Sequence, residues 1–528
     1  MLAQQLLLCY ILVSYGRASW TSQHAFSAAS AFEPTKRIGV VGLGTGGIAT
    51  LRALRALPMH MREGWQITAF DERHAVGGLW VPQDYPPDPP SVPQTPAYPG
   101  LRMNAVHMHM TVPGEPFPPE TPLLAPRERV LEYWQGLFDA TPLGEHDRVL
   151  LRHSVTSAAW VGDAERGHWD VQVMDLSTNR TMGFQFDNLI VAPGVNRFPR
   201  VPTFEGQDAW LAAGKRLEHC MWFRDSNRYA GQTVLTVGGG PSGLDVARHV
   251  VHTARKLYWS RQDGEPELPD IRGAENVPRM VSLKKGLPTL NNGSTLPDVD
   301  TIILATGYEV RVPFLSATGF LDETPPLNGD RLTTNGRYIS PLYEHTVALD
   351  SRYPPGALYF ISLLTYNPTG MTNAAQATFA AYTIANASLL DARDELRAAL
   401  AQREQHVRNE AGVEPERYGH KVNSGYGAEE GYAADGFYQD LLVRSLVARD
   451  PRLAGMPGIP RGGFNLTERW RVWVMEHTDQ VLVGWHEMVD ERGEGWEEEF
   501  VRGQGTEADY MDTMRRFLEF WDDYSEPE

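Results

Sequence analysis

Two glycine triplets of the same form are the residues whose spacing points most directly to chemistry. They are Gly42-x-Gly44-x-x-Gly47, with a further glycine at Gly46, and Gly238-x-Gly240-x-x-Gly243, which includes Ser242. Each follows a predicted strand and precedes a predicted helix. In that setting the first glycine permits a tight turn, the second lets a pyrophosphate approach the backbone, and the third lets helix and strand pack closely. Each triplet therefore predicts a helix N-terminus that holds the diphosphate of a dinucleotide.

The residues that end the next strand differ between the two sites. Asp71, followed by Glu72, ends the strand after the first triplet, where a carboxylate accepts a hydrogen bond from a ribose. Ser260 and Arg261 occupy that place after the second triplet, and an arginine pairs with a 2′-phosphate that an acid would repel. We therefore assign NADPH, rather than NADH, to the second site. Two dinucleotides in one chain imply a hydride exchange, usually between a flavin and a nicotinamide.

Two alternating strand–helix units must position these turns, which predicts doubly wound parallel sheets. The first unit has strands at 37–41 and 66–70 around a helix at about 46–57. The second has strands at 233–237 and 256–260 around a helix at 244–252. The remaining expectations are an irregular proline-dense segment at 84–99, a β-meander at 150–191, a strand at 188–192, a buried strand at 301–304, and helices at 374–390, 391–408 and 438–447.

Further segments resemble motifs of the flavin-containing monooxygenases, which have separate FAD and NADPH domains. Gly77-Gly78-Leu79-Trp80 is similar to the family's segment beneath the FAD, and Leu101-Arg102-Met103-Asn104 to its "LxTN" segment. Ala305-Thr306-Gly307-Tyr308 resembles its second "ATG" strand, and Ala192-Pro193-Gly194 its first. His219 and Phe223 fall in a degraded form of its F-x-G-x-x-x-H-x-x-x-[F/Y] fingerprint, where Ala212 replaces Phe. The resemblance covers about residues 36–390.

The resemblance implies an α/β fold of two Rossmann-like dinucleotide-binding domains, with the NADPH domain inserted into the FAD domain. The FAD domain would comprise residues 36–200 and 301–528, and the NADPH domain residues 201–300. The last segment would end in a helical, acidic region, for which a solvated charged face is the simplest interpretation because like charges favour water.

The activity that the resemblance implies is an NADPH-dependent monooxygenation with FAD. A peroxyflavin would deliver one atom of dioxygen to a soft nitrogen or sulfur nucleophile of a small organic substrate. Asn104 would lie nearest the peroxide or the nicotinamide ribose, as the catalytic candidate. His219 would position NADP⁺. The other candidate cofactor contacts are Gly78, Leu79, Trp80, Ala305, Thr306, Gly307 and Gln376, the last of these on a helix that carries Thr372 and Asn373.

Two alternatives remain at this stage. A Baeyer–Villiger monooxygenase, which inserts oxygen beside a ketone, has a fingerprint that closes with Trp, and Trp222 neighbours Phe223 here. An NADPH oxidase-like or non-catalytic flavoprotein would account for the substitutions Met103, Pro193 and Ala212.

The pattern of histidines and methionines between positions 107 and 110 is ambiguous. His107 and His109 alternate with Met108 and Met110 along an expected strand. Structural roles are favoured over a metal site for the histidines, and core packing over an active-site wall for the methionines. No metal is expected.

Composition narrows the class of protein. The chain has 528 residues, 42% hydrophobic and 22% charged, typical of a globular protein of two to four domains. A net charge of −18 argues against nucleic acid as the main partner. Only Cys9 and Cys220 are present, which excludes a Cys-x-x-Cys redox pair. No apolar run is long enough to span a bilayer. The oligomeric state is left open.

The N-terminal residues 1–31 resemble a short signal peptide, because Leu6–Val13 is uniformly apolar and small residues follow. This favours the secretory pathway over the cytoplasm. Four glycosylation sequons, at Asn179, Asn292, Asn386 and Asn465, add little weight because about two are expected by chance.

Overall fold

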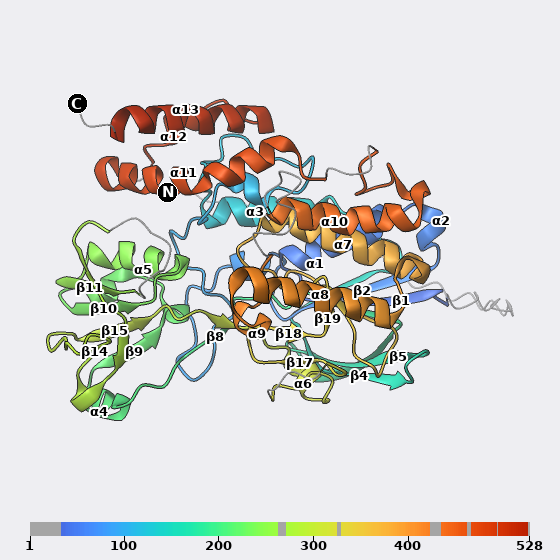
Figure 1. Ribbon diagram of the computed structural model, residues 1–528, viewed down its shortest axis with the longest axis horizontal. Coiled ribbons are helices and arrows are strands. Elements are labelled where there is room, and N and C mark those ends of the chain that lie inside the picture. Colours follow the sequence, from blue (N-terminus) through green and yellow to red (C-terminus); the bar gives the residue numbers. More distant parts are fainter. Residues whose placement is uncertain are drawn as a thin grey trace, which may run out of the picture.

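The computed structural model describes residues 33–261, 271–324, 329–422, 434–461, 466–493 and 495–525. The expected signal segment at 1–31 and the sequon at Asn465 lie outside these residues. The described chain forms two lobes, each built on its own sheet (Figure 1). The larger lobe contains the first glycine triplet and the smaller one the second.

A seven-stranded sheet forms the centre of the larger lobe. Its order is β19 (Leu342–Tyr343), β20 (Val347–Ala348), β21 (Leu358–Phe360), β7 (Asn188–Val191), β1 (Lys36–Val41), β2 (Trp65–Asp71) and β3 (Arg148–Leu151). The strands from β21 to β3 are parallel, and β19 and β20 add an antiparallel edge. The strands next to the first triplet are therefore buried on both faces, as their apolar sequences require.

A five-stranded sheet, entirely parallel, forms the centre of the smaller lobe. Its order is β12 (Ala274–Val277), β11 (Lys256–Ser260), β10 (Thr233–Val237), β15 (Thr301–Leu304) and β9 (Arg216–His219). Since β15 pairs with β10 and β9, the predicted boundary at residue 301 is corrected: the inserted domain extends through this strand. Sequence alone did not reveal this, because a buried strand pattern does not identify its neighbours. The two-sheet α/β fold itself is confirmed.

Helices on one face of the larger sheet form a layer over the first triplet. In this layer α7 (Thr369–Ala385) packs against both α1 (Thr45–Ala56) and α10 (Ala434–Arg449) (Figure 1). Almost every residue of α7 is buried, which explains why it is apolar and small on all sides. The other helices of this lobe include α2 (Met59–Arg62), α3 (Arg127–Asp139), α8 (Arg393–Ala411) and α9 (Pro415–Tyr418).

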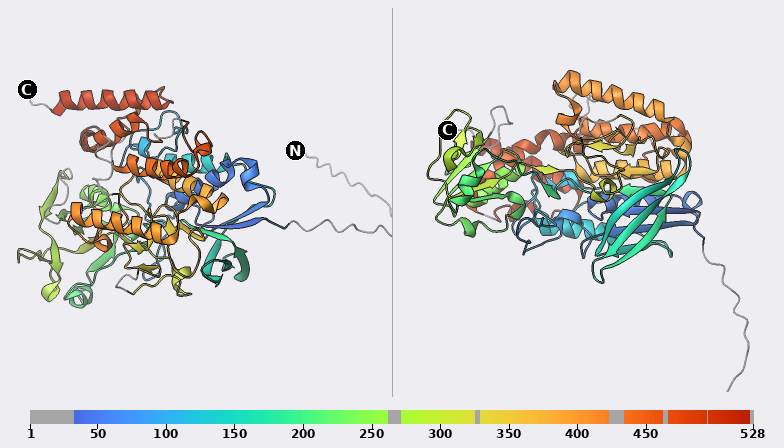
Figure 2. Two further views of the ribbon diagram at one scale, coloured as in Figure 1. Left: turned by 45° about the vertical axis from the view of Figure 1, so that its right-hand side comes forward. Right: turned by 90° about the horizontal axis from the view of Figure 1, so that it is seen from below.

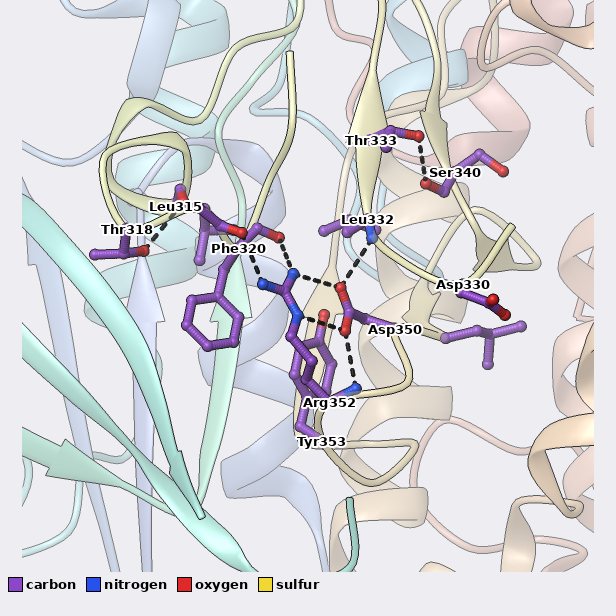
Figure 3. Close-up of polar contacts among 12 residues, drawn as sticks. Leu315, Thr318, Phe320, Asp330, Leu332, Thr333, Ser340, Asp350, Arg352 and Tyr353 are labelled. Carbon is purple, nitrogen blue, oxygen red and sulfur yellow. Dashed lines mark hydrogen bonds and ion pairs between the residues drawn. The ribbon is translucent and has the colours of Figure 1, made fainter. Parts of the chain in front are cut away.

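The meander expected at 150–191 is confirmed as a three-stranded antiparallel sheet of β4 (His153–Gly162), β5 (Gly167–Asp175) and β6 (Arg180–Phe186) (Figure 2). A neighbouring segment, which includes α6 (Pro313–Ser316), is held by an ion pair between the buried Asp350 and the partly exposed Arg352 (Figure 3). Asp350 accepts hydrogen bonds from Arg352 and from the Leu332 amide, while Arg352 also donates to the carbonyl oxygens of Gly319 and Phe320. This pair fixes Gly319, Phe320 and Leu332 against the loop that leads into β21.

The acidic C-terminal region is more than a solvated face. It consists of α11 (Arg469–Arg492), α12 (Glu498–Val501) and α13 (Glu507–Ser525), which lie across both lobes (Figure 1). Trp485, Met488, Met514 and Phe517 pack with Val106 and Met108 in one buried cluster. The acidic residues Asp512 and Glu519 stay exposed on α13. Within the described residues, no helix combines the length and apolar character needed to cross a membrane.

Residues 107–110 are not part of a strand, so that prediction was wrong. They form a short 3₁₀ helix, η2 (His107–Met110), whose His109 amide bonds the carbonyl of Val106. Alternating residue types imitate strand periodicity over so few residues, and tertiary packing decides the backbone.

Candidate functional site

The first glycine turn is built by close backbone contacts. Gly42 has φ +94°, and a side chain there would collide with the carbonyl of Ala192. A side chain on Gly47 would collide with the carbonyl of Gly42. The helix α1 begins at Thr45, with no side-chain cap and no acidic residue in its first turn. Its N-terminal amides and dipole are therefore available to an anion.

Gly44 faces Gly78 across this turn. A Cβ on Gly44 would lie 3.3 Å from the Cα of Gly78, and a Cβ on Gly78 would lie 2.7 Å from the Cα of Gly44. The Gly77 amide donates to the carbonyl of Leu43 at 2.8 Å, which ties the 77–80 segment to the turn. Leu79 and Trp80 follow in the short helix η1 (Gly78–Trp80). Two backbones without side chains thus form a narrow cradle beside the N-terminus of α1, a shape that fits a dinucleotide diphosphate.

Asp71 ends β2 beside the same turn. Its carboxylate accepts hydrogen bonds from the amides of Leu43 at 2.7 Å and Arg73 at 2.8 Å, and it is only 4% exposed. The neighbouring Glu72 pairs with Arg197 at 3.1 Å. Asp71 therefore fixes the turn, and each of its oxygens keeps a lone pair for a ribose hydroxyl. The ribose contact itself stays a prediction.

The second glycine turn repeats the construction of the first. Gly238 has φ +123° and meets the carbonyl of Ala305, as Gly42 meets that of Ala192. Gly243 packs on the carbonyl of Gly238, as Gly47 does on that of Gly42. Beyond Gly240, where α5 (Pro241–Val251) begins, a Cβ would find no atom within 4 Å. This open cradle fits the diphosphate of a second dinucleotide.

The residues after β15 support this second turn. Ala305 backs Gly238, and the Thr306 hydroxyl donates to the carbonyl of Arg200 at 2.6 Å. Gly307 accepts a hydrogen bond from His219 Nε2 at 3.0 Å, while His219 Nδ1 accepts from the Met221 amide at 3.0 Å. These partners fix the neutral Nε2–H tautomer, and burial lowers the His219 pKa to about 4. In the structure His219 therefore contacts protein with both ring nitrogens.

The side chains around the second turn have unequal access to a ligand. The Ser260 hydroxyl is buried, donating to the carbonyl of Pro278 and accepting from the Met280 amide. Ser242 hydrogen-bonds Tyr308. Arg261 leaves the end of β11 and stacks on Trp259, with its guanidinium carbon 4.4 Å from the ring centroid. Of the two residues predicted to select the nucleotide, Ser260 is buried, whereas Arg261, just after the C-terminal end of β11, is partly exposed.

Asn104 lies at the junction of the two lobes. The preceding Leu101 packs against the apolar clusters of both lobes. Tyr98 donates to Asp245 of α5, and the Met103 amide donates to the carbonyl of Ala125. Asn104 itself is exposed. Its catalytic role stays a prediction.

Gln376 is placed differently from the expectation. It is fully buried, and both ends of its amide are bonded within the protein. On the same helix, Asn373 Nδ2 donates to Thr45 Oγ1 at 3.0 Å, so Asn373 touches the first turn directly. Helical spacing places Asn373 and Gln376 on one face of α7, but only the tertiary structure distinguishes their partners.

A small cavity beside the N-terminus of α7 was not anticipated. Met108, Met371, Val474 and Met475 line it, together with His109, Pro368, Gln439, Thr467 and Arg471. Arg471 donates to the carbonyl of Met108 and to Thr111, and pairs with Glu507 at 2.9 Å. The C-terminal helices thus close a largely apolar space next to η2. Nothing in the local sequence relates α11 to residues 107–111.

The His107 ring is buried among aromatic side chains and makes no hydrogen bond. It is 0% exposed, neither ring nitrogen has a hydrogen-bond partner, and its ring lies 4.3 Å from that of Tyr510 and 5.0 Å from that of Phe117. Burial lowers its pKa to about 3. In the described part of the chain, no group of three or more potential ligands could hold a metal ion.

We expect His107→Phe to make the protein less sensitive to acid. The unfolded chain binds a proton on His107 below about pH 6.5, and the native state only near pH 3, so the free energy of unfolding falls as pH falls through this window. Phenylalanine removes that slope, about 1.4 kcal/mol per pH unit. The melting temperature of His107→Phe should match that of the wild type at pH 7.5 and exceed it at pH 5.5.

His109→Phe provides the control for this prediction. His109 Nε2 hydrogen-bonds Thr478 at 3.0 Å, so its replacement should lower the melting temperature even at pH 7.5. A large loss of stability in His107→Phe at pH 7.5 would contradict the packing role.

Comparison with known proteins supports the geometry. Residues 35–274 match the sequence model of the family described as flavin-binding monooxygenase-like. The thiol-specific monooxygenase of Saccharomyces cerevisiae is 28% identical over 317 residues, which span 59% of this chain and 69% of that protein. Senecionine N-oxygenase of Tyria jacobaeae is 26% identical over 332 residues, 60% of this chain and 65% of that protein.

A solved structure extends the likeness to most of the chain. The S-allyl-L-cysteine S-oxygenase from Allium sativum superposes with a TM-score of 0.66 at 20% identity, covering 92% of this chain and 99% of that one. At this identity the likeness shows the fold, including the C-terminal region that the family's sequence model does not reach.

Proposed function

We propose that this chain, which belongs over residues 35–274 to the flavin-binding monooxygenase-like family, oxygenates a soft nitrogen or sulfur atom of a small organic substrate. It is a flavin-dependent monooxygenase, and its cofactors are FAD and NADPH. The observation that carries the proposal is the repeated construction of the two glycine turns, one in each lobe. The 98–104 segment lies between them.

The first turn fits FAD, and the second fits NADPH. At the first, the Gly44–Gly78 cradle, the N-terminus of α1 and the carboxylate of Asp71 match a diphosphate and a ribose. At the second, the open face of Gly240 and the side chain of Arg261 match a diphosphate and a 2′-phosphate. Bound together, the two cofactors supply the hydride and the activation of dioxygen.

The protein's own contribution is positioning and the exclusion of water. Asn104, at the junction of the lobes, can donate its amide hydrogens to a ligand held there. The first turn of α7 touches the FAD-binding turn through Asn373, and on another side it borders the methionine-lined cavity through Met371. The C-terminal helices close that cavity. Exclusion of water from the reacting flavin would favour transfer of oxygen over its loss to solvent.

The substrate class is supported by the relatives. The two relatives are named for a thiol and for N-oxygenation. These names favour a substrate that carries a thioether, a thiol or a tertiary amine.

We expect Arg261→Ala to weaken discrimination between the two nicotinamide cofactors. Loss of the guanidinium removes a charge-assisted contact to the 2′-phosphate, so the KM for NADPH should rise about tenfold, the value that corresponds to about 1.4 kcal/mol. The KM for NADH, which has no such phosphate, should stay within about twofold. Steady-state oxidation of each cofactor measures both, and an equal rise for both would refute the assignment.

Product analysis tests the proposed function itself. The FAD-loaded protein is incubated with NADPH and dioxygen in three separate reactions, which contain a thioether, a tertiary amine or a cyclic ketone. A sulfoxide or an N-oxide, formed in proportion to the NADPH consumed, is the expected result. A lactone from the ketone would instead establish Baeyer–Villiger chemistry. Hydrogen peroxide equal to the NADPH consumed, with every substrate, would establish an oxidase.

A further inference from the structure

A buried chain of hydrogen bonds connects α10 with the backbone beside the first glycine turn. The Tyr438 hydroxyl donates to the carbonyl of Glu344 at 2.7 Å and accepts from Gln376 Nε2 at 2.9 Å. Gln376 Oε1 in turn accepts from the Ser362 amide at 3.0 Å. Because the single hydroxyl proton is used on Glu344, the direction of every bond is fixed. Gln376 is 0% exposed and Tyr438 2%, so water cannot replace these partners.

One end of the chain holds the residue that packs on the first turn. Ser362 has φ +67°, a left-handed conformation that costs a non-glycine residue about 1 kcal/mol. Its Cβ lies 2.8 Å from the position that a Cβ on Gly46 would take. Gly46 belongs to the first turn of α1, whose amides would face a diphosphate bound there. The backbone at Ser362 therefore limits where the N-terminus of α1 can lie.

The other end holds a second left-handed segment. Glu344 and His345, with φ +45° and +54°, form the tight turn between β19 and β20, closed by the Thr346 amide on the carbonyl of Tyr343 at 2.9 Å. Such a turn normally contains Asn or Gly. The hydrogen bond from the Tyr438 hydroxyl to the Glu344 carbonyl holds this turn in place. Gln376 and Tyr438 thus hold both ends of the segment that contains β20 and β21, between Glu344 and Ser362.

We propose that Gln376 and Tyr438 are positioning residues for the FAD-binding turn. They hold Ser362 against Gly46, and so set the place of the α1 N-terminus against the diphosphate. Tyr438 belongs to α10, which lies outside the 35–274 segment that matches the family. The C-terminal half of the chain therefore completes the FAD site. This inference rests on FAD binding at the first turn and not on the nature of the oxygen acceptor.

The test compares two buried tyrosines. Tyr438→Phe removes the hydroxyl that links Gln376 to Glu344. Tyr382→Phe is the matched control, because Tyr382 is also buried, lies on α7 and donates one hydrogen bond, to the carbonyl of Pro457 at 3.1 Å. The dissociation constant of FAD from each apoprotein is measured by quenching of flavin fluorescence, beside its melting temperature. We expect about tenfold weaker FAD binding in Tyr438→Phe and less than a twofold change in Tyr382→Phe, although both melt lower.

A second variant tests the other link and guards against misfolding. Gln376→Met keeps the volume but releases the Ser362 amide, so it should weaken FAD binding to a similar degree. The double variant Gln376→Met/Tyr438→Phe should bind FAD no more weakly than the worse single variant, because the two act as one unit. At saturating FAD, the KM for NADPH should stay within twofold of the wild type.

Equal FAD affinity in Tyr438→Phe and Tyr382→Phe would overturn the proposal. A rise in the KM for NADPH as large as the loss of FAD affinity would also overturn it, since it would indicate general loosening. Neither result depends on which substrate is oxygenated, so failure here is distinguishable from failure of the proposed monooxygenation.

Discussion

Gly44→Asp should leave the protein without FAD. The new side chain would enter the cradle between Gly44 and Gly78, where even a Cβ lies 3.3 Å from the opposite Cα. Its carboxylate would also occupy the N-terminus of α1 and repel the diphosphate. Burying two like charges costs several kcal/mol, and each 1.4 kcal/mol is a factor of ten. We therefore expect FAD affinity to fall by about a hundredfold or more, read from the flavin absorbance of the purified protein and by titration of the apoprotein.

Gly136→Asp is the matched control for this variant. Gly136 lies in α3 of the same lobe, and a Cβ there would find no atom within 4 Å. It should retain wild-type flavin content with only a small change in melting temperature. If Gly44→Asp kept its flavin as well, the first turn would not be the FAD site.

Gly240→Asp should raise the KM for NADPH by about a hundredfold while the bound FAD is unchanged. The space beyond Gly240 is open, so the substitution can be accommodated without a clash in the folded protein. The carboxylate would nevertheless stand where the second diphosphate approaches the N-terminus of α5, and would oppose it by the same electrostatic repulsion. Steady-state kinetics at saturating FAD measure the KM, and flavin absorbance measures the retained cofactor.

Gly240→Ala provides a graded comparison. A methyl group takes up space without adding charge, so we expect a rise of about tenfold or less. Each aspartate variant is also the other's control, because each turn should affect only its own cofactor. A parallel loss of FAD in Gly240→Asp would mean that the two turns do not bind independently. An unchanged KM for NADPH would place the nucleotide elsewhere.

The local units around the two turns could be predicted because their causes are local. β10, β11 and β15 begin and end at the predicted residues, and β1 and β2 within one residue at either end. Apolar β-branched runs and glycines at fixed offsets determine such units within about 30 residues of chain. The start of α7 was placed five residues late, since Pro368 precedes a helix that the apolar pattern shows only further on.

The part of the candidate site that could be predicted is the part where close backbone contacts require glycine. Gly42, Gly47, Gly238 and Gly243 occupy positions where any side chain would meet a carbonyl oxygen. Side chains without such a constraint were harder to place. Ser260, His219 and Gln376 match a cofactor-binding pattern, yet each has its polar atoms bonded to protein.

The sequence by itself determined that two glycine turns exist, each between a strand and a helix, that they belong to an α/β fold, and that an arginine follows the strand after the second. These properties depend on residue type and short spacing. Only the tertiary structure decided that β15 joins the smaller sheet, that α11 closes a cavity beside η2, and that Tyr438 is linked through Gln376 to Ser362 beside the first glycine turn. The physical reason is that these contacts join residues distant in the chain. Which residues become partners depends on burying the apolar faces and satisfying the buried hydrogen-bonding groups of the whole fold at once. A local sequence pattern does not contain this information.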